Sequence, residues 1–400
     1  MSDVPHLRFP EFSGEWYSYP LTDFMSFKNG MNPDAKRFGR GIKFISVMDI
    51  LNNQFICYDN IRASVEVIEG DIETYGVNYG DILFQRSSET LEDVGQANVY
   101  LDRKPAVFGG FVIRGKSKGN YHPVFFRYLL ASPTARKRII VKGAGAQHFN
   151  IGQDGLSRVC LNIPSIQEQE KIAKLFEYVD TRIATQNKII EDLKKLKSAI
   201  SKHLFARKDL LETTICLSNI ATLKNGYAFQ SGKYNALGKW KILTITNVSG
   251  ERYINDEDCN CIINLPNDIQ DHKVLKEGDI LISLTGNVGR VSLCKNGNYL
   301  LNQRVGLLQL AKNVNQEFLY QILSSQRFEN SMIACGQGAA QMNIGKGDVE
   351  SYVLPYSSNG NNILFAAKIL HSYDECIINE LRRLTLLTMQ KQYLLTQMFI

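Results

Sequence analysis

Two glycine-rich segments carry residue types that could bind a phosphate group. Residues 143–152 are GAGAQHFNIG, and residues 336–345 are GQGAAQMNIG. Neither ends in the Gly-Lys-Ser/Thr of a P-loop, and neither matches Gly-x-Gly-x-x-Gly followed by an acidic residue about 20 positions later. A nucleotide-binding loop would also normally occur once. We therefore expect these glycines to supply positive φ angles in a tight turn that returns the chain to a final strand.

Catalytic and metal-binding patterns are missing from the sequence. The nearest acidic clusters, Asp71 with Glu73 and the run 256–258, have no suitably placed lysine for a magnesium-dependent nuclease. There is no Gly-x-Ser-x-Gly nucleophile elbow and no Asn/Asp-Pro-Pro-Tyr/Phe motif of an adenine methyltransferase. The eight cysteines include no Cys-x-x-Cys pair, and no two histidines stand four residues apart, so zinc-site spacing is absent. We predict a chain that binds no metal or cofactor and is not itself an enzyme.

Polar side chains of the kinds that contact DNA occur in several repeated segments. Arg, Gln and Asn hydrogen-bond guanine or adenine edges, and Lys binds phosphate. A net charge of +6 mildly favours a polyanionic partner. For each candidate, a base contact, a phosphate contact and a plain surface role stay open, and a type I′ turn is the structural alternative for each Lys-Asn-Gly. The candidates are Lys28, Asn29, Gln85, Arg86, Ser87, Ser88, Gln147, His148, Lys224, Asn225, Tyr227, Thr285, Asn287, Arg290, Gln303, Arg304, Gln341 and Asn343.

The repeated segments divide the chain into two similar halves. KNG occurs at 28–30 and again at 224–226, and YGDILFQ at 79–85 recurs as EGDILIS at 277–283. The offset between matching positions stays between 191 and 198, and small insertions or deletions in surface loops account for the drift. The two halves are therefore copies of one plan.

The first part of each half has short apolar runs between Gly, Asn and Asp turns. Strands are expected in KFISVMDI (43–50), DILF (81–84) and AVFGGFVIR (106–114), with one helix near PVFFRYLLAS (123–132). This pattern predicts an α+β fold with two pseudo-symmetric, mixed α/β domains.

A long helix follows each of these parts. Neither proline nor glycine interrupts residues 167–225, and apolar residues recur at alternating spacings of four and three, as in a coiled-coil seam. Adding 194 gives a second seam, in which even the polar interruptions match: Gln186 with Glu380, and Lys197 with Lys391. Matching interruptions favour two helices packed on each other over two unrelated amphipathic core helices. The predicted seam residues are Ile172, Phe176, Val179, Ile183, Ile190, Leu193, Ile200, Leu204, Leu370, Tyr373, Ile377, Leu384, Leu387, Leu394 and Met398.

The predicted helices would act as spacers. Each has roughly 40 residues and would extend about 60 Å at about 1.5 Å per residue. If they are antiparallel, a pseudo-twofold axis relates the halves and the globular domains lie at opposite ends, which suits a DNA duplex whose grooves repeat about every 34–36 Å. The predicted boundaries are 1–163 and 208–355 for the globular domains, and 164–207 and 356–400 for the helices.

Three motifs carry a resemblance to a known family. VPHLRFPEFSGEW (4–16), GDILF with GDILIS, and IPSIQEQEKIA (163–173) resemble segments of Type I restriction-modification specificity subunits, and the likeness covers essentially the whole chain. In IPSIQEQEKIA, Ile-Pro ends a strand, and Gln-Glu-Gln-Glu places acid on the first helical turns, where the macrodipole favours it. The second copy, LPYSSNGNNILFAAKIL (354–370), lacks the acidic run.

The resemblance implies two target recognition domains, each binding one half of a bipartite double-stranded DNA site, with helical spacers that set the gap. It also implies two methyltransferase (M) subunits and restriction/translocase (R) subunits as partners, which would bind S-adenosylmethionine, ATP and Mg²⁺. The alternatives are a coiled-coil scaffold without sequence readout, and a solitary endonuclease or fused methyltransferase. No 18-residue apolar run or signal-peptide pattern occurs, so we expect a soluble cytoplasmic protein.

Overall fold

The computed structural model describes residues 4–145, 148–336 and 342–400, which form two compact units. Unit 1 contains Met1–Gln186 and Arg383–Ile400, and unit 2 contains Asn187–Arg382. Each unit therefore has one strand-rich domain and a part of each of two long helices, α6 (Ile166–Ala206) and α10 (Gly360–Gln397). The α+β architecture with an internal duplication is confirmed.

The strand-rich domain of unit 1 is built on a four-stranded antiparallel sheet, β2-β9-β5-β7. A second sheet, β4-β3-β8, shares a core with it, in which Ile45 and Phe108 pack near Leu83 and Val112. The elements are β1 (Tyr17–Pro20), η1 (Leu21–Asp23), β2 (Met25–Asn29), η2 (Ala35–Arg37), β3 (Phe38–Ile45), α1 (Val47–Asn52), η3 (Tyr58–Asn60), β4 (Ser64–Val65), α2 (Asp71–Tyr75), β5 (Ile82–Gln85), β6 (Ser87–Ser88), β7 (Ala97–Val99), β8 (Val107–Phe108), β9 (Val112–Ser117), α3 (Pro123–Ala131), α4 (Pro133–Ile140), β10 (Phe149–Asn150), α5 (Gln153–Ser157) and β11 (Cys160–Ile163).

Unit 2 repeats this topology. Its main sheet is β13-β20-β17-β18, its second sheet is β15-β14-β19-β16, and β12 pairs with β21 as β1 pairs with β11. The parallel pair β3/β8 recurs as β14/β19. The elements are β12 (Thr213–Cys216), η4 (Leu217–Asn219), β13 (Ala221–Asn225), η5 (Ser231–Lys233), β14 (Trp240–Leu243), β15 (Asn260–Ile262), η6 (Asp271–Lys273), β16 (Val274–Leu275), β17 (Ile280–Ser283), β18 (Val291–Leu293), β19 (Tyr299–Leu301), β20 (Val305–Leu310), α7 (Gln316–Leu323), α8 (Gln326–Cys335), α9 (Lys346–Glu350) and β21 (Val353–Tyr356).

Local sequence signals explain where the strand predictions were right and wrong. DILF forms β5, and the predicted helix is α3. The run 43–50 is a strand only to Ile45, because the backbone N–H of Ser46 donates to Asp49 Oδ2 (2.7 Å) in a capping box that starts α1. The run 106–114 is two strands, since the chain turns at Gly109 and Gly110 between β8 and β9.

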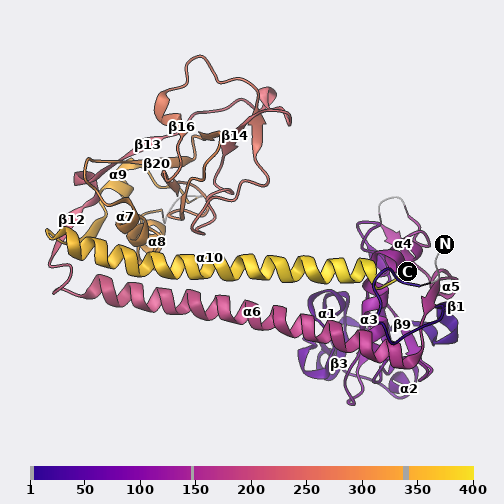
Figure 1. The fold of residues 1–400 in the computed structure, drawn as a ribbon. Helices are drawn as coiled ribbons and strands as arrows, with labels where there is room; N and C mark the ends of the chain where they lie inside the picture. Colours follow the sequence, from indigo (N-terminus) through magenta and orange to yellow (C-terminus); the bar gives the residue numbers. More distant parts are fainter. Residues whose placement is uncertain (1–3, 146–147, 337–341) are drawn as a thin grey trace. The chain divides into compact units, whose positions relative to one another are not determined.

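In each unit, α6 and α10 lie side by side and run antiparallel (Figure 1). In unit 1, Phe176, near the start of α6, packs against Phe399, which follows the end of α10 (ring centroids 5.7 Å apart). In unit 2, Leu204, near the end of α6, shares a core with Ile363 and Leu370 near the start of α10. Every predicted seam residue is buried or half-buried.

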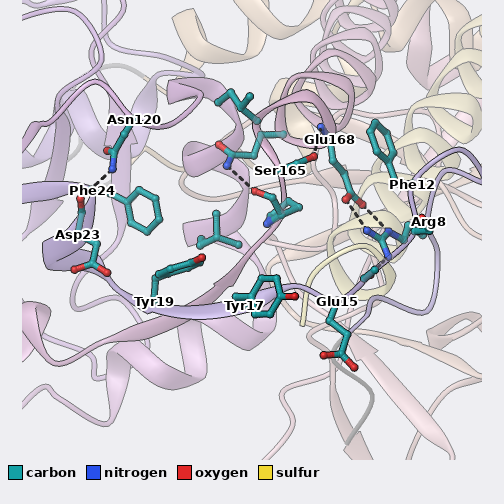
Figure 2. A pocket seen from close by; sticks show the side chains of 16 residues that line it. Arg8, Phe12, Glu15, Tyr17, Tyr19, Asp23, Phe24, Asn120, Ser165 and Glu168 are labelled. Carbon is teal, nitrogen blue, oxygen red and sulfur yellow. Dashed lines mark hydrogen bonds and ion pairs between the residues drawn. The ribbon is translucent and has the colours of Figure 1, made fainter.

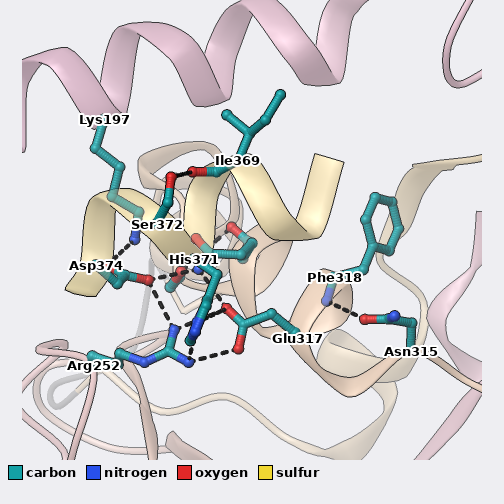
Figure 3. A network of polar contacts seen from close by, with 11 residues as sticks. Lys197, Arg252, Asn315, Glu317, Phe318, Ile369, His371, Ser372 and Asp374 are labelled. Carbon is teal, nitrogen blue, oxygen red and sulfur yellow. Dashed lines mark hydrogen bonds and ion pairs between the residues drawn. The ribbon is translucent and has the colours of Figure 1, made fainter. Parts of the chain in front are cut away.

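A buried carboxylate attaches the helices to the strand-rich domain of unit 2. Asp374 of α10 accepts hydrogen bonds from Lys197 Nζ of α6 (2.6 Å), from Arg252 Nη1 (2.9 Å) and from Gln321 Nε2 of α7 (2.6 Å), as Figure 3 shows for the first two. Arg252 also donates to both carboxylate oxygens of Glu317. This network joins three elements through one side chain.

The same attachment recurs in unit 1, with Asp180 of α6 in the role of Asp374. Asp180 lies 2.6 Å from Lys391 Nζ of α10 and accepts hydrogen bonds from Tyr128 of α3 (2.7 Å) and Gln54 (3.2 Å). Tyr128 is the sixth residue of α3, as Gln321 is of α7. The duplication therefore preserves a buried polar network as well as the sheets.

Candidate nucleic-acid interface

Backbone hydrogen bonds join four segments at one end of the main sheet of unit 1. The N–H of Arg86 donates to the carbonyl of Phe111 (2.9 Å), and the carbonyl of Arg86 accepts from Ile151 N–H (2.9 Å). β6 pairs with β10, and Gly30 N–H donates to Val112 O (3.1 Å). We call this set the recognition surface of unit 1; it comprises residues 28–31, 85–88, 109–111 and 148–150.

Unit 2 contains the same backbone frame. The N–H of Leu284 donates to the carbonyl of Arg304 (3.0 Å), and the carbonyl of Leu284 accepts from Ile344 N–H (2.9 Å). Thr285 forms an isolated bridge with Asn343. The recognition surface of unit 2 comprises residues 224–227, 283–287, 302–304 and 342–343. In both units the structure brings together candidate segments that are far apart in the sequence.

The Lys-Asn-Gly segments end the strands β2 and β13 and are not type I′ turns, so that structural alternative is wrong. Neither Gly30 nor Gly226 has a positive φ. A Cβ atom on Gly30 would lie 2.0 Å from the carbonyl oxygen of Gly109, and one on Gly226 would lie 2.1 Å from that of Asn302. Glycine is therefore required because two backbones meet closely within each recognition surface.

The glycines of the two glycine-rich segments, 143–152 and 336–345, have mixed roles. Among their described glycines only Gly145 has a positive φ, of 149°, so the conformational prediction is confirmed there and wrong for the others. The chain also does not return directly to a final strand. The short helices α5 and α9 intervene before β11 and β21.

Most of the predicted DNA contacts have accessible side chains. Gln147 and Gln341 lie outside the described residues. The exposed candidates are Lys28, His148, Asn225, Asn287, Gln303, Arg304 and Asn343. The half-buried candidates are Asn29, Arg86, Ser87, Ser88, Lys224, Tyr227, Thr285 and Arg290.

Two candidates have intramolecular roles that differ from our expectation. Gln85 is only 5% exposed, and its amide Nε2 donates to the carbonyl of Ser87 (2.9 Å), so the side chain supports the loop. Arg290 extends toward α8, where its Nε lies 3.4 Å from Glu329 Oε1. The carboxylate offsets the positive charge that a DNA contact would use.

The shared GDIL motif is a structural anchor for each recognition surface. Asp81 accepts hydrogen bonds from the backbone N–H groups of Ser117 (2.8 Å) and Asn78 (3.0 Å), and Asp279 accepts from that of Lys276 (2.8 Å). Burial raises the pKa of both carboxyl groups above their usual range, and these hydrogen bonds oppose the rise. Each aspartate thereby fixes the start of the strand that ends at the recognition surface.

The two longest motifs of the resemblance meet in a pocket of about 700 Å³ in unit 1 (Figure 2). Arg8 forms a two-point ion pair with Glu168, through Nε and Nη2 (both 2.8 Å), and Trp16 Nε1 donates to the same carboxylate (3.3 Å). Hydrogen bonding to Glu168 raises the pKa of Arg8. In unit 2 the position 194 residues after Glu168 is Asn362, which donates to Leu210 O (3.0 Å). The glutamate is therefore present in the unit where it binds an arginine, and asparagine replaces it in the other unit.

Within residues 4–145, 148–336 and 342–400, no group of three or more His, Cys, Asp or Glu side chains could hold a metal ion. None of the helices in those ranges has both the length and the apolar character needed to cross a bilayer.

Three notable positions escaped the sequence-based prediction. Phe111 is 70% exposed on the recognition surface of unit 1, but an aromatic residue between strands gives no signal of exposure. Asp180 and Asp374 stand 194 residues apart, so the repeat offset could have identified them.

Comparison with known proteins shows the same duplication. The family model described as the Type I restriction modification DNA specificity domain matches residues 13–195 and again residues 212–388. The type I restriction enzyme MjaVIII specificity subunit of Methanocaldococcus jannaschii is 24% identical over 361 residues, which are 82% of this chain and 78% of that protein.

Solved structures agree on the fold. The S subunit of a type I restriction-modification system from M. genitalium superposes with a TM-score of 0.56 at 16% identity, covering 99% of both chains. A chain solved in work on complex assembly and conformational transition of the type I R-M system gives a TM-score of 0.60 at 13% identity, covering 98% of both chains. The two matches of the family model together cover most of this chain. The chain therefore belongs to the Type I restriction-modification DNA specificity family, and it is a DNA sequence-specificity subunit.

Proposed function

We propose that each recognition surface binds one half of a bipartite DNA site. The observation that carries this proposal is that one backbone frame is built twice and presents different side chains each time. Arg86 of unit 1 corresponds to Leu284 of unit 2, and Phe111 corresponds to Arg304. Two surfaces with the same frame and different polar groups are what two different half-sites require.

The exposed side chains supply the chemistry of base and phosphate recognition. Arg304 and Gln303 can form paired hydrogen bonds with guanine and adenine edges in the major groove, and Asn287 with adenine. Lys28 and Lys224 are the last residues but one of the strands β2 and β13, at the edge of each surface, where they can bind phosphate. The surfaces therefore hold both groups that position DNA and groups that distinguish its bases.

The helices α6 and α10 supply the spacing and a docking site for the methyltransferase subunits. In unit 1, α10 exposes Leu386, Met389 and Tyr393, which are 65%, 62% and 59% exposed. Their spacing of three and four residues places them on one helical face. An exposed apolar stripe of this kind fits an amphipathic helix of a partner, and we assign it to an M subunit.

Catalysis resides in the partner subunits under this proposal. The chain contributes sequence recognition and presents adenines within its site to the M subunits, which bind S-adenosylmethionine. ATP and Mg²⁺ belong to the R subunits. What supports this division is the lack of a methyltransferase or nuclease motif in the sequence, together with the family membership.

The first experiment is to co-express this chain with its methyltransferase partner in a host that lacks the modification, and to map methylated adenines by single-molecule sequencing. We expect two short defined sequences around a fixed gap, with one modified adenine on each strand. A soluble, assembled complex that modifies nothing would instead support the scaffold alternative.

A second experiment tests the modular arrangement. Replacing residues 208–355 with the matching segment of a relative should change one half of the methylated motif and leave the other half and the gap unchanged. If both halves change, the two surfaces do not act independently.

A further inference from the structure

Phe111 occupies an unusual position for an aromatic residue. It lies between β8 and β9 in the recognition surface of unit 1, with 70% of its surface exposed. A ring exposed to this extent contributes little to the core, and an apolar side chain of this kind can contact the thymine methyl group in the major groove. The other exposed side chains of the surface, such as Lys28 and His148, are polar or charged. Phe111 is therefore the one exposed apolar side chain among the described residues of this surface.

The backbone that carries Phe111 is fixed by neighbouring groups. A Cβ on Gly110 would lie 2.0 Å from Asn32 Oδ1, and one on Gly109 would lie 2.7 Å from the ring of Phe44. The carbonyl of Phe111 accepts the N–H of Arg86 (2.9 Å), and Arg86 Nη1 donates to Gly110 O (3.3 Å). These contacts hold the turn without using the phenyl ring, so the ring is free for another role.

The equivalent position of unit 2 is Arg304. Phe111 and Arg304 directly precede β9 and β20, and their carbonyls accept the matching N–H groups of Arg86 and Leu284. Arg304 is also exposed. One backbone site therefore presents a phenyl ring in one unit and a guanidinium group in the other.

We propose that this site determines base specificity in both units, and that Phe111 contacts the C5-methyl group of a thymine in the half-site of unit 1. The inference rests on the proposed function. Thymine carries the apolar group that the major groove offers to a phenyl ring, whereas arginine pairs with the O6 and N7 atoms of guanine. Arg86, whose Nη1 donates to Gly110 O, supplies a cation beside the turn that carries Phe111.

The test uses the complex of this chain with its methyltransferase partner and duplexes that contain the mapped site. Each thymine of the unit 1 half-site is replaced in turn by deoxyuridine, which removes only the methyl group. We expect one replacement to weaken binding by about fourfold, the effect of one buried methyl group. Phe111→Ala should bind thymine and deoxyuridine duplexes equally, and Phe111→Leu should restore part of the discrimination.

Tyr79→Ala is the matched control, because Tyr79 is 57% exposed and precedes β5, whose other end reaches the recognition surface. It should leave the discrimination unchanged. Retained discrimination in a folded Phe111→Ala complex would overturn the inference, as would a unit 1 half-site with no A·T pair. Both results would leave a split methylated motif intact, whereas failure of the proposed function would abolish the motif itself.

Discussion

Lys197 Nζ lies 2.6 Å from Asp374 Oδ1, and the residues 194 positions away repeat the contact with the helices exchanged, as Lys391 Nζ with Asp180 Oδ1, also at 2.6 Å. In each pair the lysine comes from one long helix and the aspartate from the other. Each aspartate also binds residues of the adjoining strand-rich domain. The two lysines that interrupt the apolar seam therefore bind the aspartates that connect the helices to the strand-rich domains.

Replacing Asp374 by Ala should strongly destabilise the chain. The substitution leaves Lys197, Arg252 and Gln321 without their shared acceptor, and the loss of one member of a buried charged network costs about 3–5 kcal/mol. Urea unfolding of the purified full-length chain measures the difference. The control is Glu191→Ala, which removes the exposed pair with Lys195 and should leave the urea midpoint unchanged. Equal midpoints for both variants would contradict this role of Asp374.

The stability of unit 2 should depend on pH through Glu317. Burial alone would raise the pKa of Glu317, but hydrogen bonds from Arg252 and Gln321 and the charge of Arg252 lower it below the usual value. The unfolded pKa of a glutamate is about 4.3, and the folded pKa of Glu317 lies below it. The charged carboxylate therefore stabilises the fold above about pH 4.3, and this stabilisation is lost as the pH falls through the folded pKa.

Glu317→Gln should therefore lower the free energy of unfolding by about 1.5–3 kcal/mol at pH 7, and the difference from wild type should shrink below about pH 4. Because His371 Nδ1 lies 3.5 Å from the carboxylate, both proteins are also compared in a His371→Asn background. A difference that grows on acidification would disprove the assignment.

Gly226→Ala should disturb the recognition surface of unit 2. Its Cβ would lie 2.1 Å from the carbonyl oxygen of Asn302, so the strand β13 must move away, at a cost of about 1–3 kcal/mol. Gly232, with open space around its Cβ position, provides the control, and Gly232→Ala should change stability by less than about 0.5 kcal/mol. Thermal unfolding of both variants decides whether close backbone contact explains the glycine.

The lysines of the two Lys-Asn-Gly segments should control the salt dependence of DNA binding. If Lys28 and Lys224 each bind a phosphate, their replacement by Ala should reduce the slope of log K against log salt concentration by about one each. Binding of the assembled complex to its mapped site is measured between low and physiological salt. Lys195→Ala on the exposed face of α6 should leave the slope unchanged, and an unchanged slope in all three variants would exclude these phosphate contacts.

The duplicated architecture could be predicted from the sequence, because the repeated motifs and the apolar residues at spacings of three and four are visible when the two halves are aligned. The capping box at Ser46 and the turn at Gly109–Gly110 could not be predicted from the sequence. Each interrupts an apolar run that resembles a strand, and whether it does so depends on local hydrogen bonds. Gln85 was assigned to DNA contact from its residue type alone. It is the last residue of β5, in which all four side chains are buried, so the strand has no alternation of buried and exposed residues that could reveal it.

Each recognition surface is held by main-chain hydrogen bonds, by glycine contacts and by buried aspartates, none of which involves the exposed side chains. Replacement of Phe111 or Arg304 therefore leaves the supporting bonds in place. Under the inference drawn above, single substitutions at these positions would change the DNA target with little loss of stability, so changes in sequence preference would be separated from the constraints on folding.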